Sequence, residues 1–182
     1  KMCYQDPHLL QILLKKVTDS SVAYLASQIH AGADAIMIFD TWGGILSHAD
    51  YPEFSLMWMK RMVDALKAKH PEVPVILFTK GGGLWLESMA QTGCDALGLD
   101  WTISLESAHR RVGAKVALQG NLDPVVLLAG PEATQRQVQL LLESRPVSMS
   151  HIFNLGHGIL PQTPMESVDA LIETVHNFKD KP

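Results

Sequence analysis

The 182 residues carry a formal net charge of -4 and are 47% hydrophobic, which is the composition of one globular domain or of a piece of a larger one. The negative charge counts against a nucleic acid or an anionic membrane surface as partner, because either would favour a basic stripe that the sequence lacks. No apolar stretch approaches the ~20 residues that span a bilayer. Cys3 and Cys94 are too few and too far apart for a disulfide framework or a zinc motif. We therefore expect a soluble, cytoplasmic protein that binds a small molecule.

The chain alternates between amphipathic helices and short apolar strands. Helical spacing of apolar residues predicts a first helix over 6–30, with Asp6 and Pro7 at its start and Gly32 as its C-cap. The apolar run at 35–39 then predicts a strand that is buried on both faces. Helices are expected next at 52–70, 84–92, 104–112 and 131–143, strands at 73–78, 96–99, 116–119 and 151–154, and a closing helix at 164–178.

Local signals mark two of the later helix starts. Asp123 directly precedes Pro124, which favours an N-cap at Asp123. Thr163 precedes Pro164, and Glu166 follows three positions after Thr163, which is the spacing of a capping box. Both signals support the regular alternation of helices and strands.

This alternation predicts an α/β fold with a parallel sheet and helical crossovers. Two architectures fit, a doubly wound open sheet and a (β/α)8 barrel. A whole barrel takes ~250 residues and eight strands, and only about five strands are predicted here, so a barrel would be incomplete. The chain also starts at Lys1 without an initiator methionine, and we interpret it as a piece of a longer protein.

Polar residues or glycines follow every predicted strand, where both architectures place active sites. They are Asp40 and Thr41, Thr79 and Lys80, Asp100 and Trp101, Gly120 and Asn121, and Gly156 and His157. The first pair and the two glycines after it either bind a ligand or fold the turn through hydrogen bonds to its backbone. Lys80 and the glycines at 81–83 either hold an anion at a helix start or form a flexible loop. The lysine precedes the glycines, so the run is not a Walker A motif.

The imidazole of His157 lies between two glycines, Gly156 and Gly158, at the end of the last predicted strand. Its ordinary pKa of ~6.5 lets it act as a charged partner, a neutral donor or an acid-base group. The alternative is a loop histidine that bonds to the backbone. Trp101 either contacts a ligand or only forms a wall. The other histidines lack the spacing of metal ligands, so no metal site is predicted.

Four segments together resemble the successive strand-end motifs of the uroporphyrinogen decarboxylase family. They read IMIFDTWGGILS, FTKGGGLWLESMAQTGCDALGLDW, KVALQGNLDP and HIFNLGHGI, in this order and across nearly the whole chain. The resemblance covers the carboxyl-terminal half of that family's chain and implies part of a (β/α)8 barrel, with residues 1–182 as one domain segment. It implies a homodimeric, cytoplasmic carboxy-lyase of haem and porphyrin biosynthesis. That enzyme removes the carboxyl groups of the four acetate side chains of uroporphyrinogen III. The product is coproporphyrinogen III, and the reaction uses no metal or organic cofactor.

Carried over position by position, the resemblance makes Thr41 and His157 contacts of the substrate, with Lys80 and the glycine loop at 81–83 shaping the cleft. The family's catalytic aspartate and arginine motif fall in the half that this sequence lacks. No catalytic residue is therefore expected in this segment, and the chain alone is expected to be inactive. Two alternatives stay open: a non-catalytic barrel fragment that self-associates through unpaired strand edges, and a phosphate-binding barrel enzyme that uses the Lys80 loop.

Overall fold

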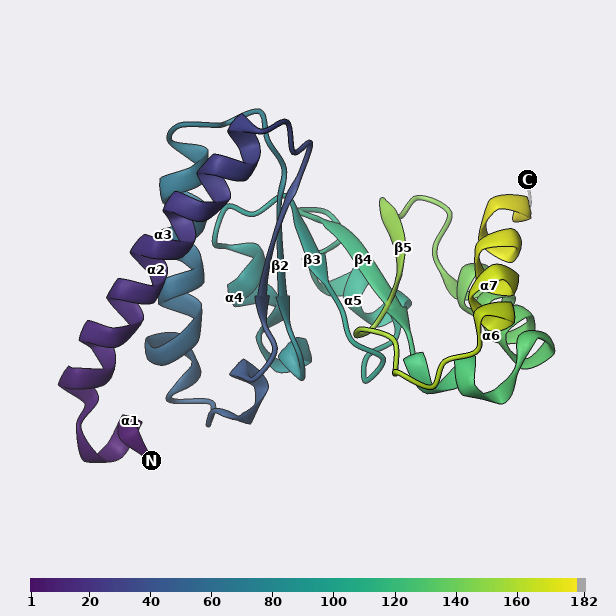
Figure 1. Cartoon of the computed structure of the whole chain (residues 1–182), viewed down its shortest axis with the longest axis horizontal. Coiled ribbons are helices and arrows are strands. Elements are labelled where there is room, and N and C mark those ends of the chain that lie inside the picture. The colour runs from purple at the N-terminus through teal and green to yellow at the C-terminus, as the bar shows by residue number, and fades with distance from the viewer. Residues whose placement is uncertain (180–182) are drawn as a thin grey trace. The chain divides into compact units, whose positions relative to one another are not determined.

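The computed structural model describes residues 1–179, so the last three residues of the expected 1–182 segment lie outside it. Helices and strands alternate along the chain (Figure 1). The strands are β1 (Ile36–Asp40), β2 (Val75–Thr79), β3 (Ala96–Gly98), β4 (Ala117–Leu122) and β5 (His151–Leu155). The α-helices are α1 (Met2–Gln5), α2 (Pro7–His30), α3 (Met57–Lys67), α4 (Leu86–Ala90), α5 (Leu105–Val112), α6 (Pro131–Ser144) and α7 (Met165–Asn177). Shorter helical turns are η1 (Gly43–Ile45), the π-helical η2 (Pro52–Leu56), η3 (Gly82–Trp85) and η4 (Pro124–Ala129).

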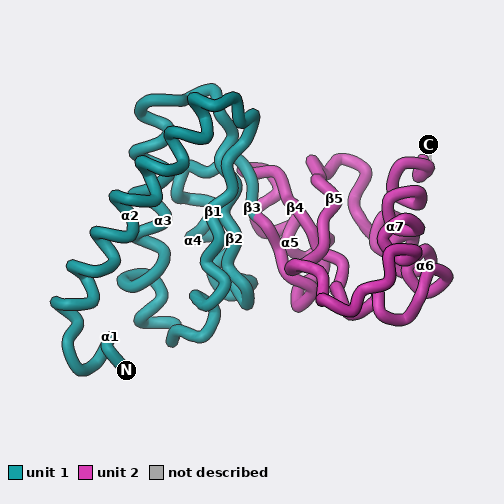
Figure 2. The backbone as a smooth tube through the Cα atoms, in the orientation of Figure 1, with its two compact units in different colours: residues 1–97 teal, residues 98–182 magenta. Residues whose placement is uncertain are grey.

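The chain divides into two compact units, Lys1–Leu97 and Gly98–Pro182, which Figure 2 shows in different colours. In unit 1, β1 pairs in parallel with β2. In unit 2, β4 pairs in parallel with β5. The registers run from Ile36 opposite Val75 to Asp40 opposite Thr79, and from Leu118 opposite His151 to Leu122 opposite Leu155.

The strand order distinguishes the two expected architectures. The strands follow one another as β1-β2-β3-β4-β5 in one sheet. A doubly wound sheet reverses its strand order at a switch point, whereas in a (β/α)8 barrel each strand lies beside the next one in sequence. The α/β fold is thus confirmed, and its strand order is that of part of a (β/α)8 barrel. Within the described residues, no helix has both the length and the apolar character needed to cross a membrane.

The long helix α2 and its N-cap Asp6 were predicted correctly, but its C-cap is Ala31, one residue before the expected Gly32. The Asp6 carboxylate accepts a hydrogen bond from the Leu9 backbone N–H at 2.9 Å, which satisfies one donor of the first turn. Gly32 follows the helix with a φ of 102°, a left-handed conformation that glycine adopts without steric cost. Helix α2 packs along α3 (Figure 1).

The expectation that the first strand is buried on both faces is wrong for Phe39. Ile36 and Ile38 are buried, but the Phe39 side chain is 65% exposed. Among the described residues the strand lies at the end of the sheet, with β2 as its one neighbour, and the Phe39 ring makes an edge contact with Phe78. A continuous apolar run indicated burial here, but its position at the end of the sheet decides which side chains are covered.

Several predicted boundaries also shift. Strand β4 continues to Leu122, so Gly120 and Asn121 lie within the strand and not after it. The helix expected at 84–92 is shorter: the turn η3 comes first, and α4 spans five residues. The helix expected at 52–70 begins as the π-helical turn η2 and ends at Lys67.

The capping box at Thr163 is absent. Helix α7 has Pro164 as its N-cap and no side-chain cap, which places the helix start one residue later than the Thr163–Glu166 spacing requires. The Thr163 hydroxyl is buried and has no hydrogen-bond partner among the described residues. Asp123, in contrast, does act as an N-cap and accepts from the Val125 N–H at 2.9 Å.

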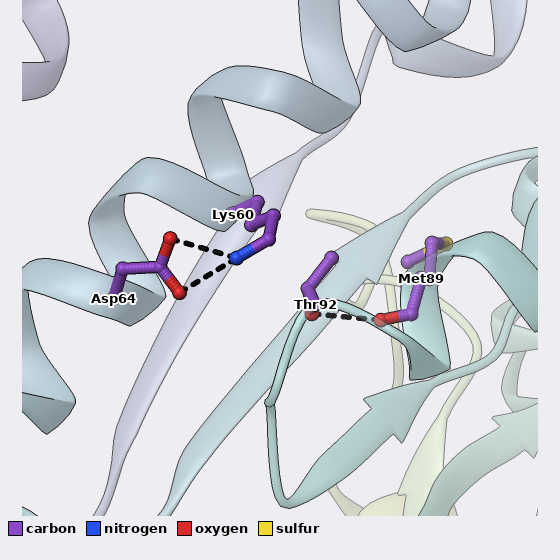
Figure 3. A network of polar contacts seen from close by, with 4 residues as sticks. All are labelled: Lys60, Asp64, Met89 and Thr92. Atoms are coloured by element: carbon purple, nitrogen blue, oxygen red, sulfur yellow. Dashed lines mark hydrogen bonds and ion pairs between the residues drawn. The ribbon is translucent and has the colours of Figure 1, made fainter.

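The core of unit 1 includes strand β2 and helix α3. Every residue of β2 is buried. Helix α3 contributes one apolar face through Trp58, Met59, Val63 and Leu66. Its outer face carries an ion pair in which Lys60 Nζ lies 2.7 Å from Asp64, and nearby the Thr92 hydroxyl donates to the Met89 carbonyl and closes α4 (Figure 3).

In unit 2 a separate apolar cluster fixes η4 and α6 against β4. Leu122, Leu127, Val138 and Leu142 are buried in it, and half-buried apolar residues of β5 and α7 pack around them. This cluster supports β4 and β5, and β5 leads to the Gly156–His157 segment.

We predict that Leu127→Ala lowers the free energy of unfolding by about 2 to 5 kcal/mol, because it leaves a cavity in this cluster. Leu128→Ala is the matched control: Leu127 is 1% exposed and its neighbour Leu128 is 37% exposed, so we expect a loss of about 1 kcal/mol or less. Urea unfolding followed by circular dichroism measures both. Equal losses would contradict the assignment of Leu127 to the core.

Candidate functional site

The carboxyl end of β1 is folded by the Asp40 carboxylate. Asp40 is half-buried and accepts hydrogen bonds from the Ser55 hydroxyl and from the Gly43 backbone N–H. A Cβ on Gly43 would lie 1.8 Å from Asp40 Oδ2, so only glycine leaves room for the carboxylate. Burial raises the pKa of this carboxyl, and the two hydrogen bonds partly oppose the rise. Asp40 therefore shapes the turn that begins with the half-buried Thr41. This fits the interpretation in which Asp40 folds the turn through hydrogen bonds to its backbone.

The loops after β1 and β2 touch through their backbones. A Cβ on Gly44 would lie 1.9 Å from the Lys80 carbonyl oxygen, so glycine at 44 permits this contact. Gly81 has a φ of 73° and turns the chain into η3. The helix that follows, α4, has only five residues and offers a weak dipole for an anion. The glycines at 44 and 81 are thus explained by packing and turn geometry, which weakens the phosphate-binding alternative.

An aromatic stack holds the same loop in place, and no local pattern in the sequence indicates it. The buried Tyr51 ring stacks on Trp85 with centroids 4.0 Å apart, and its hydroxyl lies 2.8 Å from Thr79 Oγ1. Burial raises the pKa of Tyr51 to about 12, so its phenol is neutral at physiological pH. The Trp85 indole N–H donates to His48 Nδ1 at 3.1 Å. The stack ties the segment after β1 to the end of β2.

In unit 2 the end of β3 is fixed by two polar side chains. The buried Asp100 accepts from the Thr102 backbone N–H at 2.8 Å and from its hydroxyl, which closes a tight turn. The buried Asn121 amide donates to the Asp100 carbonyl at 2.7 Å and to the Ile103 carbonyl at 2.6 Å. Both side chains therefore hold the backbone around Trp101.

His157 is half-buried in the bend after β5, and its two neighbouring glycines differ. A Cβ on Gly156 would lie 2.7 Å from the Trp101 backbone nitrogen, so Gly156 lets two loop backbones approach each other. A Cβ on Gly158 would meet nothing within 4 Å. Only Gly158 leaves open space beside the histidine.

His151, the first residue of β5, has a structural role. His151 Nε2 lies 2.6 Å from the Gly120 carbonyl, and burial lowers the pKa of His151, which favours a neutral ring that donates to this oxygen.

A groove of about 460 Å³ lies beside Trp101 and Asn121, between the end of β4 and α6, and His157 does not line it. Cys3 and Cys94 are free cysteines. Across residues 1–179 no three His, Cys, Asp or Glu side chains are grouped to hold a metal ion.

The two expected substrate contacts lie in different units: Thr41 follows β1 in unit 1, and His157 follows β5 in unit 2. Thr41 lies directly after the carboxyl end of β1, and His157 lies two residues after that of β5, so both are at strand ends as expected. Their roles in binding remain predictions.

A family model and several curated proteins match this chain. A family model described as uroporphyrinogen decarboxylase (URO-D) matches residues 1–178. The uroporphyrinogen decarboxylase of Actinobacillus pleuropneumoniae is 53% identical over 180 residues, which are 98% of this chain and 51% of the relative. Those of Shewanella piezotolerans and Legionella pneumophila (strain Paris) are each 54% identical, over 100% and 97% of this chain and over 52% and 50% of the relatives. The chain thus spans about half the length of the curated relatives it matches.

We predict that Asp40→Asn and Asp19→Asn change stability with opposite dependence on pH. Because its pKa is raised above the usual 3.8, folded Asp40 holds its proton more tightly than the unfolded chain does, and its contribution to stability is lost as pH rises through the raised value. The advantage of Asp40→Asn over wild type should therefore grow as pH rises above about 4.

For Asp19 we expect the opposite dependence of stability on pH. The hydrogen bond from Lys15 lowers the pKa of Asp19, so its contribution is present at neutral pH and is lost as pH falls. Asp19→Asn should fall behind wild type as pH rises. Urea unfolding of the three chains between about pH 3 and pH 7 measures both trends. Parallel curves for the two variants would exclude the assigned shifts.

We predict that Gly156→Ala destabilises the chain by about 1 to 3 kcal/mol, because the added methyl group must displace the Trp101 backbone. Gly158→Ala, two residues away, should change the free energy of unfolding by about 0.5 kcal/mol or less. Thermal and urea unfolding compare the pair. Similar losses in both would show that Gly156 is not needed for the packing of these loops.

Proposed function

Because the chain belongs to the uroporphyrinogen decarboxylase family, we propose that it forms the carboxyl-terminal half of such an enzyme. The whole enzyme would decarboxylate the four acetate side chains of uroporphyrinogen III to give coproporphyrinogen III. The observation that supports this most strongly is the family match over residues 1–178, joined by 53% identity to a curated decarboxylase over 98% of the chain.

The proposed chemistry requires no cofactor, because the substrate itself can accept electrons. A pyrrole ring protonated beside the acetate is cationic, so it takes up the electron pair of the breaking carbon–carboxylate bond as CO2 leaves. The methylene carbon that remains then gains a proton and the ring gives up its added proton, so that the acetate becomes a methyl group. The protein would supply a dry cleft, a carboxylate facing the pyrrole N–H groups and donors for the peripheral carboxylates. Thr41 and His157 are donors of this kind, since a hydroxyl and an imidazole can each donate to a carboxylate oxygen.

Asp40 and Asp100 are poor candidates for the carboxylate that faces the pyrroles. Asp40 accepts from Ser55 and Gly43, and Asp100 accepts from Thr102, so both carboxylates already fold their own turns. We propose instead that the catalytic aspartate and the arginine motif belong to the half of the enzyme outside this chain. This chain alone would then be inactive. A homodimeric assembly and a cytoplasmic location are further proposals, and they rest on the family resemblance.

We predict that this chain forms no coproporphyrinogen by itself and gains activity when the missing half is supplied. The missing half would be the part of the Legionella pneumophila relative that this chain does not match, co-expressed as a second chain. Product is measured by chromatography of the oxidised porphyrins after anaerobic turnover. In this assembly His157→Asn should lower kcat/KM by about 10- to 100-fold, because hydrogen bonds to charged groups are worth about 1.5 to 3 kcal/mol.

Matched variants test whether these losses are specific. Thr41→Ala should raise KM by about tenfold, whereas Thr41→Ser keeps the hydroxyl and should stay close to wild type. His176→Asn changes a histidine in the last turn of α7 and should leave kcat/KM unchanged. Unaltered turnover and affinity in His157→Asn would remove His157 from the site. Activity of this chain without the missing half would overturn its proposed dependence on that half.

A further inference from the structure

Tyr51 lies within a series of hydrogen-bonded side chains in unit 1. Its side chain is fully buried, and its hydroxyl lies 2.8 Å from Thr79 Oγ1. The same hydroxyl is also hydrogen-bonded to Ser55. The Ser55 hydroxyl donates in turn to the Asp40 carboxylate. These four side chains, here termed the Tyr51 network, form one continuous path from the end of β2 to the end of β1.

The direction of each hydrogen bond in the Tyr51 network follows from the carboxylate at its end. An ionised carboxylate only accepts, so the single hydroxyl proton of Ser55 goes to Asp40. The Ser55 oxygen must then accept from Tyr51, which leaves Thr79 as the donor to the Tyr51 oxygen. A second acceptor for Thr79, the Met59 sulfur, is 4.0 Å away and weak. Removing the Tyr51 hydroxyl would therefore leave both of its neighbours with an unmet hydrogen bond.

Both ends of the Tyr51 network are fixed to the sheet. Asp40 and Thr79 are opposite each other in the register of β1 and β2, so the network bridges two strand ends that the backbone already joins. The Tyr51 ring also stacks on Trp85, with centroids 4.0 Å apart. The phenol is thus held through its ring as well as through its hydroxyl.

The same network sets the backbone around Thr41. The Asp40 carboxylate accepts from the Gly43 N–H in addition to the network, which closes a turn that contains Thr41. A Cβ on Gly43 would lie 3.0 Å from Thr79 Cγ2, so this turn packs closely against the end of β2. A rotation of the Asp40 side chain would release the Gly43 N–H, and with it the backbone that carries the Thr41 hydroxyl.

We propose that Tyr51 is a positioning residue for substrate binding. Its hydroxyl holds Ser55 and Asp40, and through them it sets the orientation in which the Thr41 hydroxyl meets a substrate carboxylate. Tyr51 is fully buried and acts without touching the substrate. The inference rests on the proposed function, since it takes Thr41 as a contact of the substrate, and it adds the residue that holds this contact in place.

The test uses the enzyme assembled from this chain and the missing half of the Legionella pneumophila relative. Tyr51→Phe keeps the ring and its stack but removes the hydroxyl. We expect KM to rise about three- to tenfold and kcat to stay within about twofold, because a contact made equally in the ground state and the transition state changes KM alone. Ser55→Ala removes the next hydroxyl and should have the same effect.

Thr92→Val is the matched control. It removes another buried hydroxyl of unit 1, the one that donates to the Met89 carbonyl (Figure 3), and it should leave KM unchanged. Loss of a buried hydrogen bond destabilises both variants to a similar extent. A rise in KM that is confined to Tyr51→Phe and Ser55→Ala therefore reports on the site and not on stability.

A double-mutant cycle shows whether Tyr51 acts through Thr41. If it does, Tyr51→Phe should change KM by less than about twofold in a Thr41→Ala enzyme, because the contact that it orients is already gone. An equal rise in both backgrounds would overturn the proposal. So would a rise of the same size in Thr92→Val, or a rise below about threefold in Tyr51→Phe.

Hydrogen exchange of this chain alone, followed by NMR, gives a readout that needs no turnover. The Gly43 N–H is protected while Asp40 accepts its hydrogen bond, so Tyr51→Phe should speed its exchange at least about threefold, and Thr92→Val should not. Unchanged exchange in Tyr51→Phe would show that the hydroxyl does not hold this turn. An assembled enzyme that forms no coproporphyrinogen would contradict the proposed function, and exchange at Gly43 would still decide whether Tyr51 holds the turn.

Discussion

Parallel strand pairing is the constraint on which the rest of this structure depends. Because β1 and β2 run in the same direction, as do β4 and β5, each pair ends at one common edge. In unit 1 the loops that leave these ends meet, and Gly44 after β1 lies against the Lys80 carbonyl after β2. In unit 2 the loop after β5 meets the loop after β3, where Gly156 lies against the Trp101 nitrogen. Both positions are glycine because the backbone of the neighbouring loop occupies the space that a side chain would need.

This constraint changes how the glycine-rich motifs are interpreted. A glycine at a strand end indicates close approach, but the sequence does not say whether a ligand or another loop approaches. At Gly43, Gly44 and Gly156 the neighbour is the protein itself. Gly158 is different, since open space lies beside it, and it follows His157 directly. The histidine thus has one neighbour that fixes the loop and one that leaves room.

Much of the fold followed from the sequence because helices and parallel strands leave local patterns. The N-cap at Asp6, the glycine at 32 that follows the helix end and the alternation of elements are properties of short segments. The N-cap and the alternation were predicted correctly, and the glycine lies one residue after the C-cap. The predictions that were wrong concern features that depend on distant residues, or on whether a helix starts one residue earlier or later. Phe39 is exposed because of where β1 lies in the sheet, and the expected box at Thr163 fails because the helix starts one residue later.

The site could be predicted only in part for the same reason. Strand-end positions of Thr41 and His157 follow from local pattern, whereas the carboxylate of Asp40 could not be assigned before Ser55 and Gly43 were seen beside it. The stack of Tyr51 on Trp85 joins residues 34 positions apart and has no local signature.

That stack has an optical consequence. The Trp85 indole stacks on the Tyr51 phenol, and its N–H is bonded to the His48 imidazole. Indole emission is sensitive to both ring stacking and hydrogen bonding, so Trp85 acts as an intrinsic reporter of whether the segment after β1 is docked. The molecule thus carries its own probe at the loop that contains Thr41.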